Sequence, residues 1–175
     1  MSPDSSKPRS PSESEIHTYI TDYARAAKNT IAAGVDAVEI HAANGFLIDQ
    51  FTQDMCNRHT DKWGGSVENR SRLAVGVTKT AVDAVGPERR GIWLSPWSKF
   101  QGIRMTDVIP QFRHRARQLS KFRLAYILLL ESRVSGAGDA EASDQLDSLL
   151  KAFGKGSAVI VTGGYTPDRI EEAHD

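Results

Sequence analysis

Two polar side chains that follow one strand-like segment have the types and spacing needed to bind an oxygen atom. His41 comes directly after the strand-like segment 35–40, and Asn44 follows three positions later. An imidazole and a carboxamide that both donate hydrogen bonds to one carbonyl oxygen polarise that carbonyl and stabilise an enolate as it forms. Alternatively, a histidine at a strand end and an asparagine in a loop only tie down their own backbone. The two residues by themselves favour this second interpretation.

Other side chains that could do chemistry are weaker candidates. Glu131 and Arg133 stand at the end of a later strand-like segment, where they either line a pocket or form an internal ion pair. Cys56 has no acid or base at a spacing that would activate it, so a buried or unreactive thiol is expected. We expect no metal site.

Helical and strand-like patterns alternate along the chain, which is typical of a parallel sheet with crossover helices. A capping box of Ser12 and Glu15 begins the first helix, and Gly34 ends it. The third helix is expected to bury Phe112 and to expose its arginines, Arg115 among them. The expected elements are a helix over 12–34, a strand over 35–40, a helix over 66–86, a strand over 92–94, a helix over 108–119, a strand over 124–130, a helix over 142–153, a strand over 158–161 and a last helix opened by Thr166-Pro167.

Length and composition limit the classes of function. The chain has 175 residues, of which 22 are basic and 22 acidic, so nothing in its charge suggests nucleic acid or an anionic membrane as a partner. Its longest apolar run, 124–130, is far shorter than the roughly 20 residues of a membrane span. One cysteine excludes an internal disulfide, and we expect a cytoplasmic protein that acts on a small molecule. Residues 1–14 are expected to be a flexible Ser/Pro-rich tail ahead of a single domain, 15–175.

A longer motif gives the first pair of residues a specific context. The sequence His-Ala-Ala-Asn-Gly at 41–45 is followed by Thr-Asp-Lys-Trp-Gly-Gly-Ser-Val-Glu-Asn-Arg at 60–70. This combination resembles the old yellow enzymes, a family of FMN-dependent ene reductases. The resemblance implies that His41 and Asn44 hold the carbonyl oxygen of an α,β-unsaturated substrate. It also matches Gly163 and Gly164 to a strand end where backbone amides approach a phosphate, although a plain turn is the favoured interpretation here.

Two positions depart from the family pattern, and both affect redox chemistry. Phe46 stands where the family's reductases carry a proton-donating tyrosine, and a phenyl ring has no proton to donate. Trp93 stands where the family carries an arginine against the flavin ring, and an indole cannot supply that charge. Each aromatic residue either changes the chemistry or only packs in place of its counterpart. Phenylalanine at position 46 resembles the fungal ergot-alkaloid branch, that of chanoclavine aldehyde reductase/isomerase, some of whose members isomerise a double bond instead of reducing it.

The expected fold is α/β, a partial TIM barrel. About four βα units correspond to the family's units four to seven, whereas a complete barrel takes about 250 residues. Because the resemblance places other flavin-binding elements outside this sequence, we favour no cofactor, although FMN is the family's cofactor. Four parallel strands cannot close a barrel, and we assign Val38, Ile40, Leu94 and residues 128–130 to a concave face that would meet water. A homodimer that covers this face is the expected remedy.

Two functions of different classes fit these observations. The first is a flavin-independent isomerase or cyclase of fungal specialised metabolism, acting on an unsaturated carbonyl compound. The second is a non-catalytic half-barrel remnant or partner-binding protein, and a fragment of an ene reductase that needs a complementary chain is a third. We favour the first, because the motif is retained while large aromatic residues replace the two redox residues. Catalysis is then assigned to His41 and Asn44, with a pocket lined by Phe46, Trp93, Glu131 and Arg133.

Overall fold

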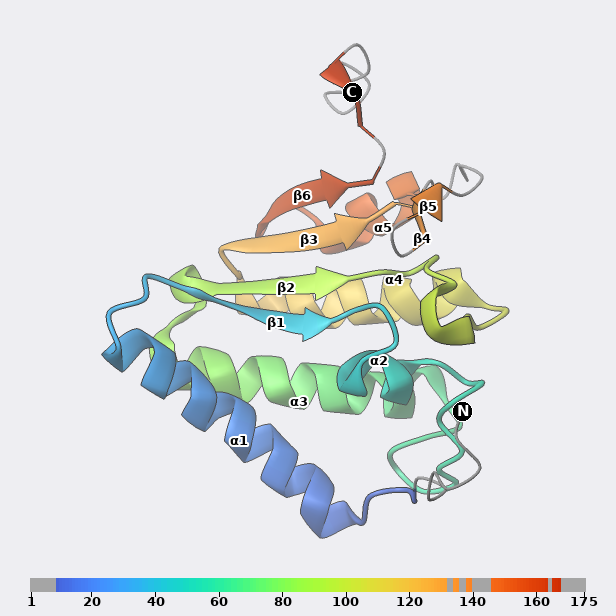
Figure 1. The fold of residues 1–175 in the computed structure, drawn as a ribbon, viewed down its shortest axis with the longest axis horizontal. Coiled ribbons are helices and arrows are strands. Elements are labelled where there is room, and N and C mark those ends of the chain that lie inside the picture. The colour runs from blue at the N-terminus through green and yellow to red at the C-terminus, as the bar shows by residue number, and fades with distance from the viewer. Residues whose placement is uncertain (1–8, 132–133, 136–137, 140–145, 164, 168–175) are drawn as a thin grey trace.

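Four parallel strands form one open sheet, with helices on one of its faces (Figure 1). The computed structural model describes residues 9–131, 134–135, 138–139, 146–163 and 165–167. The strands are β1 (Val38–Ala42), β2 (Arg90–Leu94), β3 (Tyr126–Leu130) and β6 (Ala158–Thr162), and they lie side by side in that order. The long helices are α1 (Glu13–Ala32), α3 (Val67–Val85), α4 (Val108–Leu119) and α5 (Leu146–Phe153). Chain order and sheet order agree, so the expected α/β half barrel is confirmed.

The helix starts form as expected. The Ser12 hydroxyl accepts the Glu15 N–H at 3.4 Å, and the Ser12 N–H donates to the Glu15 carboxylate at 2.8 Å. The Ser66 hydroxyl likewise accepts the Asn69 N–H at 3.2 Å. These bonds satisfy backbone donors that the first turn of a helix leaves unpaired.

The first strand begins later than predicted. The Val35 N–H donates back to the Thr30 carbonyl at 3.3 Å, at the end of α1, so Val35 belongs to the helix exit and not to the sheet. The strand then runs from Val38 to Ala42, and His41 lies inside it, one position before its end.

Three residues that we assigned to the concave face of the sheet lie on its other face. Ile40 and Leu94 are buried in the core against the helices, so placing them on the concave face was wrong, as it was for Val38, which shares their side of the strand. The open inner face instead carries a row of four neighbours in register: His41, Trp93, Leu128 and Ile160. Successive strand residues point to opposite faces, so an error of one position exchanges the faces.

The prediction that Arg115 faces solvent was also wrong. Its side chain is fully buried, donates a hydrogen bond to the Thr52 hydroxyl, and lies 5.1 Å from the ring centroid of Phe112. Arg115 is three residues after Phe112, and residues at this spacing share one face of a helix. The apolar side of α4 therefore includes one guanidinium.

Shorter elements complete the described structure. A six-residue helix, α2 (Leu47–Thr52), lies within what we expected to be a loop, and a small hairpin is formed by β4 (Val134–Ser135) and β5 (Gly138–Asp139). Single turns of 3-10 helix occur at η1 (Pro87–Arg89), η2 (Phe100–Gly102) and η3 (Ser120–Phe122). The first part of the helix expected over 142–153, most of the one expected after Pro167, and most of the expected N-terminal tail lie outside the described residues. None of the helices in the described ranges combines the length and apolarity needed to cross a bilayer.

Candidate functional site

A tight turn after β1 places Asn44 at the end of the sheet where the strands finish. Asn44 and Gly45 both have left-handed backbone angles, with φ of 52° and 75°. The Asn44 N–H donates to the Ser95 hydroxyl at 2.6 Å, which ties the turn to the end of β2. A Cβ atom on Gly45 would come within 2.9 Å of the Ile103 side chain, so the turn requires glycine here.

His41 lies between the two aromatic residues that depart from the family pattern. Its ring centroid is 4.7 Å from that of Phe46 and also 4.7 Å from that of Trp93. Trp93 is its neighbour in register on β2, and Phe46 follows the turn as the N-cap residue of α2. The structure therefore brings together three of the predicted site residues, and the two aromatic rings hold the imidazole by ring-to-ring contact.

The side chains of His41 and Asn44 form few hydrogen bonds within the described structure. The Nδ1 atom of His41 accepts the Ala43 N–H at 3.4 Å, which assigns the proton of a neutral imidazole to Nε2. The Asn44 side-chain oxygen is buried without a hydrogen-bond partner among the described residues. Among the described residues, Nδ1 is thus the one side-chain atom of His41 and Asn44 that forms a hydrogen bond with the local backbone. Among the described residues, neither the Nε2–H of His41 nor the carboxamide of Asn44 has a hydrogen-bond partner.

The other predicted pocket residues lie farther along the sheet. Glu131 follows β3 and is buried; its carboxylate accepts a hydrogen bond from the Tyr165 hydroxyl, and its N–H donates to the Thr162 carbonyl at 2.8 Å. Gly163 follows β6 with φ of 132°. Because β2 separates β1 from β3, the structure gathers these residues into a second group, beside the end of β6. Arg133 and Gly164 lie outside the described residues.

A buried carboxylate that the sequence analysis missed supports the turn after β1. Asp49 on α2 is 1% exposed and accepts the Gly45 N–H at 2.9 Å and the Gln53 side-chain amide at 3.1 Å. Gln53 in turn accepts the Met105 N–H at 2.8 Å. Burial raises the pKa of Asp49, while the Gly45 hydrogen bond and the charge of Arg115 act in the opposite direction. A signal was present in the sequence, because Asp49 and Gln53 are polar residues one helical turn apart and therefore share a helix face.

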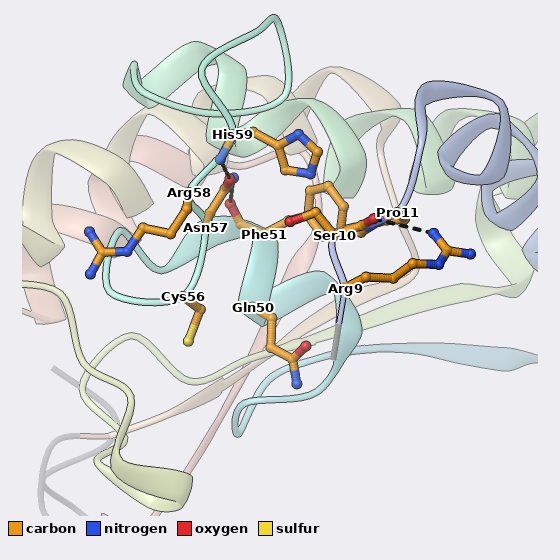
Figure 2. Close-up of a pocket in the computed structure, with 9 residues that line it drawn as sticks. All are labelled: Arg9, Ser10, Pro11, Gln50, Phe51, Cys56, Asn57, Arg58 and His59. Atoms are coloured by element: carbon orange, nitrogen blue, oxygen red, sulfur yellow. Dashed lines mark hydrogen bonds between the residues drawn. The ribbon is translucent and has the colours of Figure 1, made fainter. Parts of the chain in front are cut away.

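Two hollows of the described surface lie away from these residues. A cleft of about 200 Å³ opens between α2 and the segment before α1, as Figure 2 shows, and a cavity of about 220 Å³ lies between α1, α3 and the start of the sheet. Cys56 lines the cleft and is exposed, contrary to a buried position, although partial burial raises the pKa of its thiol. The cleft is lined by Arg9, Ser10, Pro11, Gln50, Phe51, Cys56, Asn57, Arg58 and His59. Neither of these two hollows is lined by His41 or Asn44.

Curated proteins with similar sequences come from fungi. A protein of Penicillium roqueforti (strain FM164) named chanoclavine-I aldehyde reductase fgaOx3 is 55% identical over 175 residues, which are all of this chain and 47% of that protein. A probable inactive dehydrogenase, easA, of Claviceps purpurea is 47% identical over 181 aligned residues, covering all of this chain and 48% of that protein. The chain thus spans about half the length of the curated relatives that it matches.

Solved structures of related proteins superpose closely on this chain. The old yellow enzyme homologue of Zymomonas mobilis superposes with a TM-score of 0.88 at 32% identity, covering all of this chain and 50% of that one. Morphinone reductase superposes with a TM-score of 0.87 at 32% identity, covering 96% of this chain and 44% of that one. Residues 4–175 match the family described as NADH:flavin oxidoreductase / NADH oxidase. The chain therefore belongs to this family, that of the old yellow enzymes.

Proposed function

We propose that the chain isomerises or cyclises an α,β-unsaturated carbonyl compound of fungal specialised metabolism without net oxidation or reduction. The observation that carries the proposal is the group of His41, Phe46 and Trp93, in which two aromatic rings flank an imidazole whose Nε2–H is free. The side-chain NH2 of Asn44, on the turn that follows, is the second donor of the proposed pair. His41 and Asn44 act on the substrate oxygen, while Phe46 and Trp93 form an apolar wall against a flat conjugated system.

Hydrogen bonds to the carbonyl oxygen promote this chemistry. They draw electron density from the conjugated double bond towards oxygen, which weakens that bond and lowers the barrier to rotation about it. Rotation exchanges the E and Z forms of the substrate and leaves its atoms and electrons unchanged. The same polarisation makes the substrate more electrophilic, so that a nucleophile within the substrate can add and close a ring. In the ring closure, the proton that the nucleophile loses is transferred to the enolate carbon, so the step balances within the substrate. Neither reaction then draws a proton from position 46.

The described inner face does not fit FMN well. The row through His41 contains Trp93, Leu128 and Ile160, and the next row contains Glu39, Gly91, Tyr126 and Ala158. None of these described side chains is a lysine or an arginine, whereas a flavin phosphate and a reduced flavin ring are anions that call for cationic partners. Trp93 also occupies the place that an arginine takes in the family pattern. This supports a reaction in which FMN takes no part.

The names of the relatives support the substrate class. The Penicillium relative is called an aldehyde reductase, and the Claviceps relative a probable inactive dehydrogenase. An aldehyde is a carbonyl compound of the kind that a pair of hydrogen-bond donors activates. We therefore infer an unsaturated aldehyde as the substrate and a fungal biosynthetic pathway as its setting.

Citral tests the proposal directly, because its two forms, geranial and neral, are E and Z isomers of one unsaturated aldehyde. The purified chain, without flavin or NADPH, is mixed with geranial, and the aldehyde proton signals are followed by NMR. We expect neral to form faster than in buffer, with no loss of the double bond. The Asn44→Ala variant controls for isomerisation by surface lysines. A rate equal to that of buffer, or loss of the double bond only after FMN and NADPH are added, would refute the proposal.

A further inference from the structure

The inner face of the sheet exposes apolar side chains that nothing covers among the described residues. Ile160 is 45% exposed in the middle of β6, and Leu128 and Trp93 beside it are only partly buried. A parallel sheet normally has both faces covered, because its strands are apolar on both sides. The helices cover the other face only (Figure 1).

The two edges of this sheet are complementary to each other. β1 and β6 are the outer strands of the described sheet, and they run in the same direction, since each neighbouring pair is parallel. Each edge therefore presents backbone N–H and C=O groups that a parallel strand can pair with. The free edge of β6 in one copy is suited to the free edge of β1 in another.

We propose that two copies of this chain associate around a two-fold axis parallel to the strands and close one barrel. Each copy contributes four strands, and eight is the number at which a parallel barrel is filled by its own side chains. In this arrangement β6 of each protomer pairs with β1 of its partner, and the rows of His41, Trp93, Leu128 and Ile160 become the packed interior. A formal net charge of zero means that the copies do not repel each other strongly.

The dimer also completes the site. A two-fold axis along the strands keeps all strand ends on one side, so both copies of His41 and Asn44 open at the same mouth. The inner face of the partner then forms the missing wall opposite each His41. This inference rests on the sheet and not on the proposed reaction, and its test measures mass and not turnover.

Light scattering on the size-exclusion peak of the intact chain at micromolar concentration tests the proposal. We expect a mass of about twice 19.2 kDa. Ile160→Lys places a charge in the interface and is expected to give a monomer. Met55→Lys is the matched control, because Met55 is 52% exposed but lies in the segment after α2 and not on a strand of the sheet, and it is expected to leave the dimer intact.

A second interface variant is included in case Ile160→Lys does not fold. Leu128→Glu introduces a charge on the neighbouring strand of the same row, and circular dichroism shows whether each variant keeps its helices. A stable, monodisperse monomer for the unmodified chain would overturn the proposal and indicate another cover for the face. A dimer that survives in folded Ile160→Lys and Leu128→Glu would overturn it as well.

Discussion

At the scale of single residues, the free donors of His41 and Asn44 decide whether this site acts on an oxygen. We expect His41→Ala and Asn44→Ala each to lower the rate of citral isomerisation about a hundredfold, since removing one donor of such a pair typically has an effect of this size. His17→Ala and Asn29→Ala, two exposed positions on α1, are the matched controls. If turnover stayed within a few-fold of the unmodified chain while circular dichroism was unchanged, the assigned role would be wrong.

Phe46 gives a second prediction at this scale. Phe46→Tyr restores the hydroxyl that the family's reductases carry, and the side chain is 51% exposed, so the change is expected to alter the free energy of unfolding by less than about 0.5 kcal/mol. Because rotation about a polarised double bond needs no acid, citral isomerisation is expected to change by only a few-fold. NADPH oxidation with added FMN is the companion measurement. Reduction of the double bond by this variant would show that only the acid was missing.

At the scale of elements, the alternation of helices and strands could be predicted from the sequence, whereas the buried polar residues could not. His41, Phe46 and Trp93 meet in the structure because a local motif and a strand pair place them, and such patterns are visible in one sequence. Arg115 was misplaced because its charge was taken as a sign of exposure, although its spacing from Phe112 indicated the core. Its burial depends on Asp49 and Thr52, more than sixty residues away along the chain. Long-range pairing of this kind leaves no periodic signal.

The group around Asp49 gives a prediction about stability. Asp49→Ala removes the acceptor of the Gly45 N–H and leaves the buried Arg115 guanidinium without its counter-charge, so we expect a loss of about 3–5 kcal/mol in the free energy of unfolding. Urea denaturation measures it. Asp83→Ala, which removes an exposed ion pair with Lys79, is the matched control and should cost less than about 1 kcal/mol. Equal losses in the two variants would show that the buried group does not support the turn.

The same carboxyl group makes stability depend on pH. Burial raises the pKa of Asp49 in the folded chain. A raised folded-state pKa contributes stability that is fully present below the unfolded value of about 3.9 and is lost as pH rises through the folded value. The stability of the unmodified chain relative to Asp49→Asn should therefore fall as pH rises across this window. Urea denaturation of both chains at several pH values gives this difference, and a constant difference would contradict the shift.

At the scale of the whole molecule, the two faces of the described four-stranded sheet differ in how they are covered. The core between sheet and helices is complete, with Ile92, Leu94, Ile127 and Leu129 fully buried. The inner face is not, and the free energy available from covering it is what would hold two copies together. Association of this kind couples folding to concentration, so the melting temperature is expected to rise with protein concentration. A melting temperature that does not change would indicate a self-sufficient monomer.

Amide hydrogen exchange tests whether the two copies associate through the edges of the sheet. The amides of β2 and β3 are paired on both sides within one chain, whereas β1 and β6 each have one unpaired edge in the described sheet. Exchange at β1 and β6 should therefore slow down when the protein is concentrated tenfold, because the partner's strand then protects those edges for more of the time. Exchange at β2 and β3 serves as the internal reference and should change less. If the concentration dependence instead appeared on the outer helices α1 and α3, the two copies would be meeting through their helical faces, and the barrel would stay open.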